Sequence, residues 1–200
     1  MFGPHERRIS DAYRALYLDV DALVGLVRGW KANADRILEV GCGEGTVTQR
    51  LRAAYPEAKI TAIDISPRIG RLYSGPTDDL QFVQCEVQDI ASTEPGRFDL
   101  VVLSDVLHHV PAVARQTLLE AIRATLAPHG TLVFKDWEKN RSPIHWLCHA
   151  SDRWLTGDRV VYMTREEMRE KLIHCFGDNA LIAEARIRPW WNNFAIAVRI

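Results

Sequence analysis

Three glycines at alternate positions, Gly41, Gly43 and Gly45, follow the short run Ile37–Val40. When a strand ends in glycines and a helix follows, backbone N–H groups and the positive end of the helix face the space above the sheet. Dinucleotide cofactors use one form of this turn, which requires the pattern G-x-G-x-x-G. Thr46 occupies the position of the third glycine in that pattern. The turn therefore predicts a bound cofactor, but the dinucleotide interpretation is weakened by one residue.

A carboxylate follows the glycine turn at a distance that suits a nucleoside. Asp64 ends the apolar stretch KITAID, about 20 residues after the glycines, where an acidic side chain can accept hydrogen bonds from ribose hydroxyls. Each feature alone has a structural explanation, since a glycine-rich turn can be only a turn and a strand-ending Asp can cap a helix. Their order and spacing together favour cofactor binding.

Acid–base groups follow two later apolar runs. His108 and His109 come after FDLVVLS, and Asp136 lies at the end of TLVFKD. The carboxyl ends of parallel strands surround the ligand crevice, so these side chains are expected to meet there. An aspartate can orient a histidine and stabilise its cation, and a base must stand within about 3 Å of the proton it removes. The alternative is that one histidine packs in the core and the other begins a helix.

The sequence around these groups predicts alternating strands and helices. Apolar runs are expected to form strands at 36–40, 59–65, 80–87, 98–104 and 131–137. Helical spacing is seen at 10–30, with Ser10 as a cap, and at 46–55, 67–74 and 113–127. Strands that alternate with helices predict an α/β fold with a parallel sheet covered on both faces.

The C-terminal third departs from this alternation. Residues 138–163 are expected to be less regular, and Thr164–Glu167 is a capping box that opens a helix reaching Phe176. Two alternating runs around Pro189–Asn192 predict a terminal β-hairpin. His145 and His149 could ligate zinc, but two histidines without an adjacent glutamate base are a weak signal.

The bulk composition describes one ordinary globular domain, residues 1–200. The chain is 47% hydrophobic and 26% charged, with a net charge of -1. This charge balance favours a small-molecule substrate and no nucleic-acid partner. Stable membrane insertion is not expected, because no apolar run reaches the ~18 residues of a span. Four well-separated cysteines and an N-terminus without an apolar signal segment predict a cytoplasmic protein; the oligomeric state is not predicted.

Taken together, the motifs resemble those of class I S-adenosylmethionine-dependent methyltransferases. The resemblance runs from Arg36 to Trp137 and rests on EVGCGEG, Asp64, FVQCEVQDI, FDLVVLSDVLHHV and LAPHGTLVFKDW. It implies a Rossmann-like, doubly wound sheet of seven strands, mostly parallel, with an antiparallel strand from the C-terminal hairpin. Separately, the residues of these segments lead us to expect that an N-terminal helix within residues 1–34 forms a partial lid and that residues 138–163 form a substrate lid.

The same resemblance assigns cofactor roles to individual residues. Glu39 would hold the methionine end of S-adenosylmethionine, Gly41 and Gly43 would let the backbone approach, and Asp64 would bind the ribose. Glu86 and Val87 would meet the adenine, although the family more often has Asp at the first of these positions. The remaining cofactor contacts are Cys42, Ile65 and Ser104, the last near the sulfonium. The product would be S-adenosylhomocysteine.

The resemblance also bears on the chemistry. Some O-methyltransferases of the family use a histidine from an LHH stretch with an aspartate after the fifth strand. The second His of this motif recurs with unrelated substrates, so His108 is favoured as the base over His109, with Asp136 as its partner. Catechol methyltransferases instead hold Mg²⁺ with carboxylates at the positions of Asp105 and Asp136, but an Asn follows there and Trp137 follows here. No metal is therefore predicted.

The acceptor is predicted only as a class. Tyr13, Trp137 and His149 are expected to contact it, and the tryptophans of residues 146–191 form either an aromatic wall or part of the core. A hydroxyl or activated carbon of an aromatic, quinone-like or polyketide/polyene metabolite fits best. The alternative from a different class is a non-catalytic module that binds the cofactor or a nucleoside. A nucleic-acid methyltransferase is disfavoured because N/D-P-P-Y and Pro-Cys motifs are missing, and a nicotinamide oxidoreductase because of Thr46.

Overall fold

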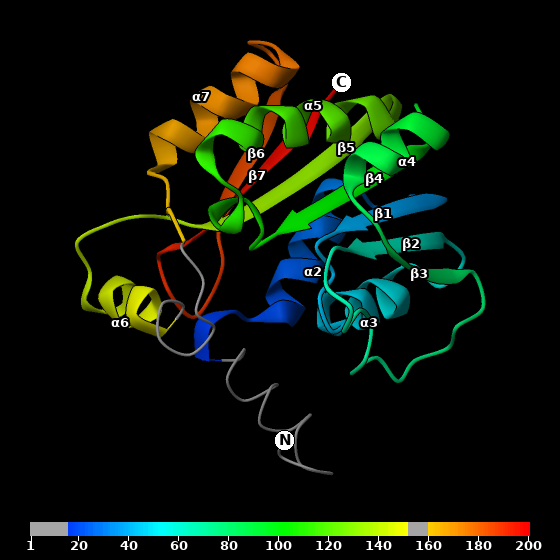
Figure 1. Ribbon diagram of the computed structural model, residues 1–200, viewed down its shortest axis with the longest axis horizontal. Coiled ribbons are helices and arrows are strands. Elements are labelled where there is room, and N and C mark those ends of the chain that lie inside the picture. The colour runs from blue at the N-terminus through cyan, green and yellow to red at the C-terminus, as the bar shows by residue number, and fades with distance from the viewer. Residues whose placement is uncertain (1–15, 152–159) are drawn as a thin grey trace.

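The computed structural model of the protein describes residues 16–151 and 160–200, and the account below is confined to them. One seven-stranded sheet runs through the molecule in the order β3-β2-β1-β4-β5-β7-β6, with helices on both faces (Figure 1). The strands are β1 (Arg36–Val40), β2 (Lys59–Asp64), β3 (Leu80–Gln84), β4 (Phe98–Ser104), β5 (Leu126–Trp137), β6 (Leu181–Arg186) and β7 (Asn193–Arg199). β1 to β5 pair in parallel, and β7 is antiparallel to both β5 and β6. The predicted α/β sheet with its C-terminal hairpin is confirmed.

Two sets of helices bury the two faces of this sheet. These helices are α2 (Val20–Trp30), α3 (Thr46–Ala54), α4 (Val87–Thr93), α5 (Arg115–Thr125) and α7 (Arg165–Phe176). The helix α6 (Pro143–Ser151) belongs to neither set, and short 3-10 helices span Leu107–His109 and Ala112–Ala114. Successive strand residues point to opposite faces, so Ile37 packs with α2 and α3 while Leu38 packs with α4, α5 and α7. Because both faces are buried, the central strands are nearly continuous apolar runs.

The capping box at the start of α7 is confirmed. The Glu167 N–H donates to the Thr164 hydroxyl at 3.2 Å, and the Thr164 N–H donates to the Glu167 carboxylate at 2.7 Å. Two backbone donors that no helical partner could reach are thereby satisfied.

The prediction of a helix at 67–74 is wrong, since these residues form turns. Gly70 lies in the left-handed region at φ 62°, and its N–H donates to the Gly43 carbonyl. The Leu72 N–H likewise donates to the Glu44 carbonyl. These two backbone N–H groups thus bond to the glycine turn and not to carbonyls within a helix. The third predicted strand is also shorter, because Glu86 caps α4.

Within the described residues, α2 is part of the helix predicted at 10–30. Asp19 is the N-cap of α2, and its carboxylate accepts the Ala22 N–H at 2.9 Å. Leu23 and Val27 are buried against the sheet, so α2 is part of the fold's helical layer. The predicted cap Ser10 lies outside the described residues, and the lid function of residues 1–34 stays a prediction.

Residues 138–163 are more ordered than expected where they are described. They contain α6, and Glu138 and Met163 form an isolated parallel bridge. The lid function of this segment also stays a prediction. Among the helices of the described ranges, none combines the length and the apolar character needed to cross a membrane.

Candidate active site

A cavity of about 1170 Å³ opens at the carboxyl ends of β1 to β5. The predicted site residues that line it are Glu39, Gly41, Cys42, Gly43, Asp64, Ile65, Glu86, Val87, Ser104, His108, His109 and Trp137. The sheet therefore brings the predicted cofactor residues and both histidines to one space. Tyr13 lies outside the described residues, and His149 is not among the residues that line the cavity.

The glycine turn needs its glycines for two separate reasons. Gly41, Gly43 and Gly45 have φ values of 75°, 52° and 93°, in the left-handed region that disfavours side chains. A Cβ on Gly41 would also lie 2.2 Å from Cγ2 of Val106. The turn is held in place because the Gly41 and Cys42 N–H groups donate to the Ile63 carbonyl at 2.8 and 3.0 Å. Backbone thus fills the floor of the cavity, where a ligand can approach closely.

Asp64 is fixed by the same turn. Its Oδ2 accepts the Gly43 N–H at 2.7 Å, and its Oδ1 accepts the Ser66 N–H at 2.7 Å. A carboxylate can accept about four hydrogen bonds, so both oxygens keep capacity for ligand hydroxyls. Burial and the negative charges of Glu39 and Asp64 raise the pKa of the Cys42 thiol. Cys42 therefore lines the cavity as a neutral, apolar side chain.

The predicted adenine end lies at the start of α4. Glu86 is the N-cap of this helix, and its N–H donates to the Asp89 carboxylate at 3.1 Å. Val87 is buried and Ile65 is exposed, and both border the cavity. This end combines an apolar surface with an acceptor side chain, as a purine base requires.

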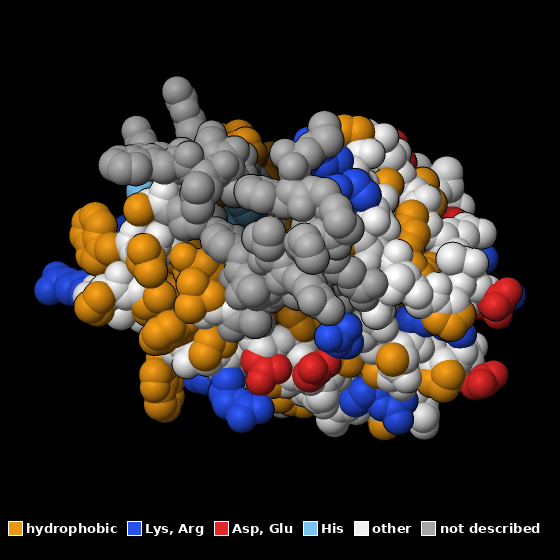
Figure 2. All heavy atoms as spheres, turned by 90° about the horizontal axis from the view of Figure 1, so that it is seen from below, with side chains coloured by type: hydrophobic (Ala, Val, Ile, Leu, Met, Phe, Trp, Pro, Cys, Tyr) orange, Lys and Arg blue, Asp and Glu red, His pale blue; other side chains and the backbone are white. Residues whose placement is uncertain are grey.

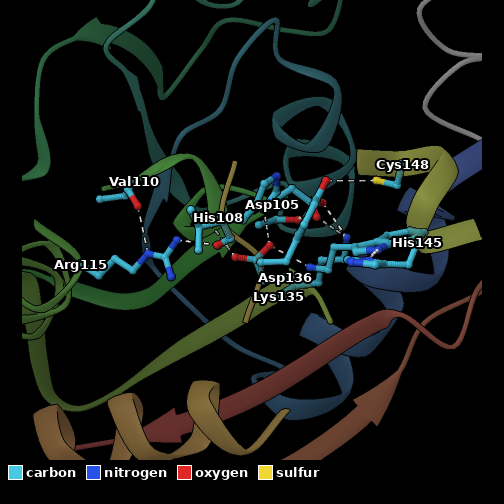
Figure 3. A network of polar contacts seen from close by, with 12 residues as sticks. Asp105, His108, Val110, Arg115, Lys135, Asp136, His145 and Cys148 are labelled. Carbon is cyan, nitrogen blue, oxygen red and sulfur yellow. Dashed lines mark hydrogen bonds and ion pairs between the residues drawn. The ribbon is translucent and has the colours of Figure 1, made fainter. Parts of the chain in front are cut away.

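His108 and Asp136 form a buried pair (Figure 3). His108 Nδ1 contacts Asp136 Oδ1, and the His108 backbone N–H donates to Oδ2 at 3.1 Å. The Trp137 N–H donates to Oδ1 at 2.8 Å. Burial alone would raise the pKa of Asp136, but the charge and hydrogen bond of His108, the Trp137 N–H and the charge of Lys135 together lower it. An ionised Asp136 fixes the proton on Nδ1 and leaves Nε2 of His108 as the acceptor.

The structure separates the two adjacent histidines. Their ring centroids lie 4.2 Å apart, and both rings border the cavity. His108 is buried and contacts Asp136, whereas His109 is exposed. The arrangement that orients a base is therefore built around His108.

A buried ion pair next to this histidine was not predicted. Lys135 is only 1% exposed, and its Nζ lies 2.5 and 2.6 Å from the two carboxylate oxygens of Asp105. Ligand atoms of Asp105, His108 and Asp136 lie within 4.8 Å of one another, close enough to hold a metal ion. Lys135 already supplies a positive charge to Asp105. The signal in the sequence was a lysine inside the apolar run TLVFKDW.

Aromatic side chains form the wall beside the pair. Trp137 Nε1 donates to His145 Nδ1 at 3.1 Å, and the Tyr162 ring stacks on His108 with centroids 5.0 Å apart. Burial, with the nearby charges of His149 and Lys139, lowers the pKa of His145. His145 is thereby kept neutral as the acceptor for Trp137. Sequence reasoning missed Tyr162, because no motif marks it.

Of the tryptophans considered for an aromatic wall, Trp154 lies outside the described residues, and Trp146, Trp190 and Trp191 do not line the cavity. Trp190 packs against the cluster of Trp137, and its Nε1 donates to the Leu16 carbonyl at 2.6 Å. Trp146 and Trp191 are 71% and 78% exposed. Hydrophobic side chains gather on this face over α6 and the β6–β7 connection (Figure 2). Trp146 and Trp191 thus face outward and do not line the cavity.

A buried arginine connects this wall to the histidine loop. Arg115, 2% exposed, donates from Nε to the Val110 carbonyl at 2.9 Å and from Nη2 to the Val161 carbonyl at 2.5 Å. The Val161 N–H donates to the His108 carbonyl at 2.9 Å. Burial lowers the pKa of Arg115, while the charges of Asp136 and Glu167 raise it. These bonds tie residues 160–162 to the His108 loop, and no sequence motif indicated them.

Comparison with known proteins agrees with this arrangement. Residues 38–132 match the family described as "Methyltransferase domain". The chain is 34% identical over 112 residues to a ubiquinone biosynthesis O-methyltransferase of Xanthomonas campestris pv. campestris, covering 54% of this chain and 44% of that protein. It is 34% identical over 128 residues to a trans-aconitate 2-methyltransferase of Streptomyces avermitilis, covering 60% and 46%. The chain thus spans less than half the length of these relatives.

A solved structure with a similar fold is the Burkholderia thailandensis 1,6-didemethyltoxoflavin-N1-methyltransferase, with bound 1,6-didemethyltoxoflavin and S-adenosylhomocysteine. Its TM-score is 0.70 at 19% identity, covering 100% of this chain and 91% of that one. At this identity the likeness concerns the fold. Residues 38–132, just under half of the chain, match the methyltransferase domain family, and the chain shares its fold with this solved methyltransferase.

Proposed function

We propose that the protein transfers a methyl group from S-adenosylmethionine to a hydroxyl of a small-molecule acceptor. One observation carries this proposal: the glycine turn with Asp64 and the oriented His108 border the same cavity. A cofactor-binding module without chemistry has no need of a buried Asp136 that orients a histidine toward that cavity. The proposed setting is cytoplasmic and belongs to secondary metabolism.

The residues present fit the proposed cofactor. Gly41 and Gly43, both in the left-handed region, let the backbone itself border the cavity. Asp64 retains acceptor capacity for ribose hydroxyls, and the carboxylate of Glu39 borders the cavity on the same side. Two acidic side chains suit a cofactor that carries an ammonium and a sulfonium. When bound, S-adenosylmethionine supplies a methyl group activated for displacement and leaves as S-adenosylhomocysteine.

The chain's own residues handle the proton and the alignment. His108 Nε2 would accept the hydroxyl proton of the acceptor as the oxygen is methylated. Asp136 holds the ring in the required tautomer and stabilises the charge that the ring gains. Trp137, which borders the cavity, would exclude water and position a planar acceptor, while Tyr162 supports the His108 ring by stacking on it.

The acceptor class follows from the wall and the base together. We infer an aromatic, quinone-like or polyketide/polyene compound with a hydroxyl group, and an activated carbon as the second choice. The match to an O-methyltransferase of ubiquinone biosynthesis supports a hydroxyl acceptor. The match to a trans-aconitate methyltransferase shows that relatives also act on non-aromatic acids, so the aromatic class rests on the wall.

Calorimetry with S-adenosylhomocysteine tests the cofactor half of the proposal. We expect micromolar binding, weakened about tenfold or more in Asp64→Asn, because the variant loses the charge that bonds the ribose and the Gly43 N–H. Asp78→Asn, at an exposed turn residue outside the cavity, should bind like the wild type. Absence of binding would end the proposal.

A transfer assay tests the catalytic half. Tritium from methyl-labelled cofactor should enter a small organic compound when the protein is mixed with extracts of the source cell. The labelled product would then be identified. Tight cofactor binding with no transfer to any extract would favour the non-catalytic binding module instead.

A further inference from the structure

Lys135 has one hydrogen-bond donor that the structure leaves unused. An ammonium carries three N–H donors, and two of them are accounted for by the two oxygens of Asp105 at 2.5 and 2.6 Å. The Lys135 ammonium forms no other hydrogen bond within the described residues. The side chain is 1% exposed and borders the cavity. Leaving a buried charged donor unsatisfied is costly, so the cavity is where its acceptor is expected.

The position of Lys135 relative to His108 narrows the kind of acceptor. Lys135 and Asp136 are successive residues of β5, so their side chains leave the strand toward opposite faces. Asp105, the partner of Lys135, lies with a carboxylate oxygen within 4.8 Å of a ring nitrogen of His108. Lys135 and His108 therefore approach the same part of the cavity from the two sides of the sheet edge (Figure 3).

We propose that Lys135 binds a second oxygen of the acceptor, on the carbon next to the hydroxyl that His108 deprotonates. The acceptor class is then a ring or chain with two adjacent oxygens. This inference rests on the proposed function and deepens it. Because the Lys135 ammonium already supplies a positive charge beside Asp105, added divalent cation is not needed for this contact.

The proposed methyl transfer would use His108, Lys135 and bound S-adenosylmethionine. The hydroxyl proton moves to Nε2 of His108, and a new O–CH₃ bond forms as the S–CH₃ bond breaks. The electron pair of that bond stays on sulfur, which becomes a neutral thioether. The Lys135 ammonium stabilises the negative charge that develops on the paired oxygens as the proton leaves. Asp105 holds the Lys135 ammonium in place.

Two isomeric benzenediols test the proposal by calorimetry on the full chain saturated with S-adenosylhomocysteine. Catechol has adjacent oxygens, whereas hydroquinone has the same two hydroxyl groups on opposite sides of the ring. We expect catechol to bind about tenfold more tightly, the loss that one hydrogen bond to a charged donor produces. The preference should persist in excess EDTA and should not increase with Mg²⁺.

Variants assign the preference to the lysine. Lys135→Met should bind both isomers equally while retaining its affinity for S-adenosylhomocysteine. Because this change leaves Asp105 unpaired, Lys135→Met/Asp105→Asn, which removes both charges, gives the same comparison in a neutral site. Lys59→Met is the matched control, since Lys59 also faces an aspartate but is exposed and distant from the cavity. It should keep the wild-type preference.

Results that contradict the role of Lys135 can be distinguished from results that contradict the proposed function. Equal affinity of the wild type for the two isomers, including no binding of either, overturns the proposal, as does a preference that survives in both lysine variants. Loss of S-adenosylhomocysteine affinity in Lys135→Met would mean that the third N–H donor of Lys135 bonds to the cofactor. This result would also overturn the proposal. A preference abolished by EDTA would assign the oxygens to a metal. Failure of the wild type to bind S-adenosylhomocysteine would instead reject the proposed function itself.

Discussion

The two ends of the cavity are built in different ways. At the proposed cofactor end, the glycine turn supplies backbone, and Asp64 is fixed by the backbone N–H groups of Gly43 and Ser66. At the acceptor end, Asp105 and Asp136 each contact an ionisable side chain from elsewhere in the chain, Lys135 and His108. The first end depends on local backbone conformation, and the second on charge pairs buried between distant segments.

This difference predicts how each end responds to mutation. A change at the cofactor end has to disturb the backbone, so it should alter binding and stability together. At the proposed acceptor end, a side-chain charge can be removed while the sheet stays intact. Turnover can therefore change while the affinity for the cofactor stays the same. Substitutions that reverse this expectation would show that the two ends are coupled.

The largest effect is expected from His108→Ala. Turnover should fall by ~10²-fold or more, because the acceptor proton loses its base, while S-adenosylhomocysteine affinity stays within about twofold of the wild type, since the cofactor contacts are unchanged. Single-turnover transfer and calorimetry measure the two quantities. His109→Ala is the control, since its ring borders the same cavity but lies away from Asp136. Equal losses in both variants would contradict the assignment of the base.

Asp136→Asn should show the next largest effect, as a pH-dependent loss of stability. The pKa of Asp136 in the folded protein lies below the ordinary carboxyl value of 3.8. Its contribution is therefore complete above that value and is lost as the pH falls through the lower folded pKa. Above about pH 5 the variant should be less stable by about 2–3 kcal/mol, because the buried partner of His108 is gone.

Urea unfolding of wild type and variant between neutral and strongly acidic pH measures this gap. The gap should narrow on acidification, and the exposed Asp78→Asn should show no comparable difference. A gap that stays constant down to the lowest pH would mean that Asp136 is not ionised in the folded protein.

The contrast between the ends also explains what the sequence could predict. The glycine turn, Asp64 and the parallel strands follow from local patterns, and the structure brings these residues to one cavity. The prediction of a helix at 67–74 was wrong because the Gly70 N–H donates to the Gly43 carbonyl, which is distant in the sequence. Lys135 and Tyr162 were missed for the same reason: their roles depend on partners that only the folded sheet supplies.

Gly41→Ala tests the backbone character of the cofactor end. A left-handed φ of 75° costs an L-residue about 1–2 kcal/mol, and the new Cβ would clash with Val106. We expect about 2 kcal/mol of lost stability and at least tenfold weaker S-adenosylhomocysteine binding, since turn and ligand share the backbone. Thermal unfolding and calorimetry measure both.

Two variants separate the clash from the strain at Gly41. Gly41→Ala/Val106→Ala should relieve the clash and leave the conformational cost. Gly25→Ala, within α2 where an added Cβ meets nothing, should raise stability by up to about 1 kcal/mol. Loss of stability without loss of cofactor affinity in Gly41→Ala would break the proposed link between turn and ligand.

The smallest effect is expected from Arg115→Met, which should lower the stability of the fold and also weaken acceptor binding. The variant loses hydrogen bonds to the Val110 and Val161 carbonyls, while methionine restores part of the buried volume, so the cost should be about 1 kcal/mol. Arg123→Met on the same helix loses one bond to the Cys175 carbonyl, away from the cavity. Both variants should lower the free energy of unfolding similarly.

Only Arg115→Met should also raise KM for the acceptor, by a factor of about three, because residues 160–162 lose their tie to the His108 loop. Equal KM values in the two variants would mean that Arg115 supports the fold alone.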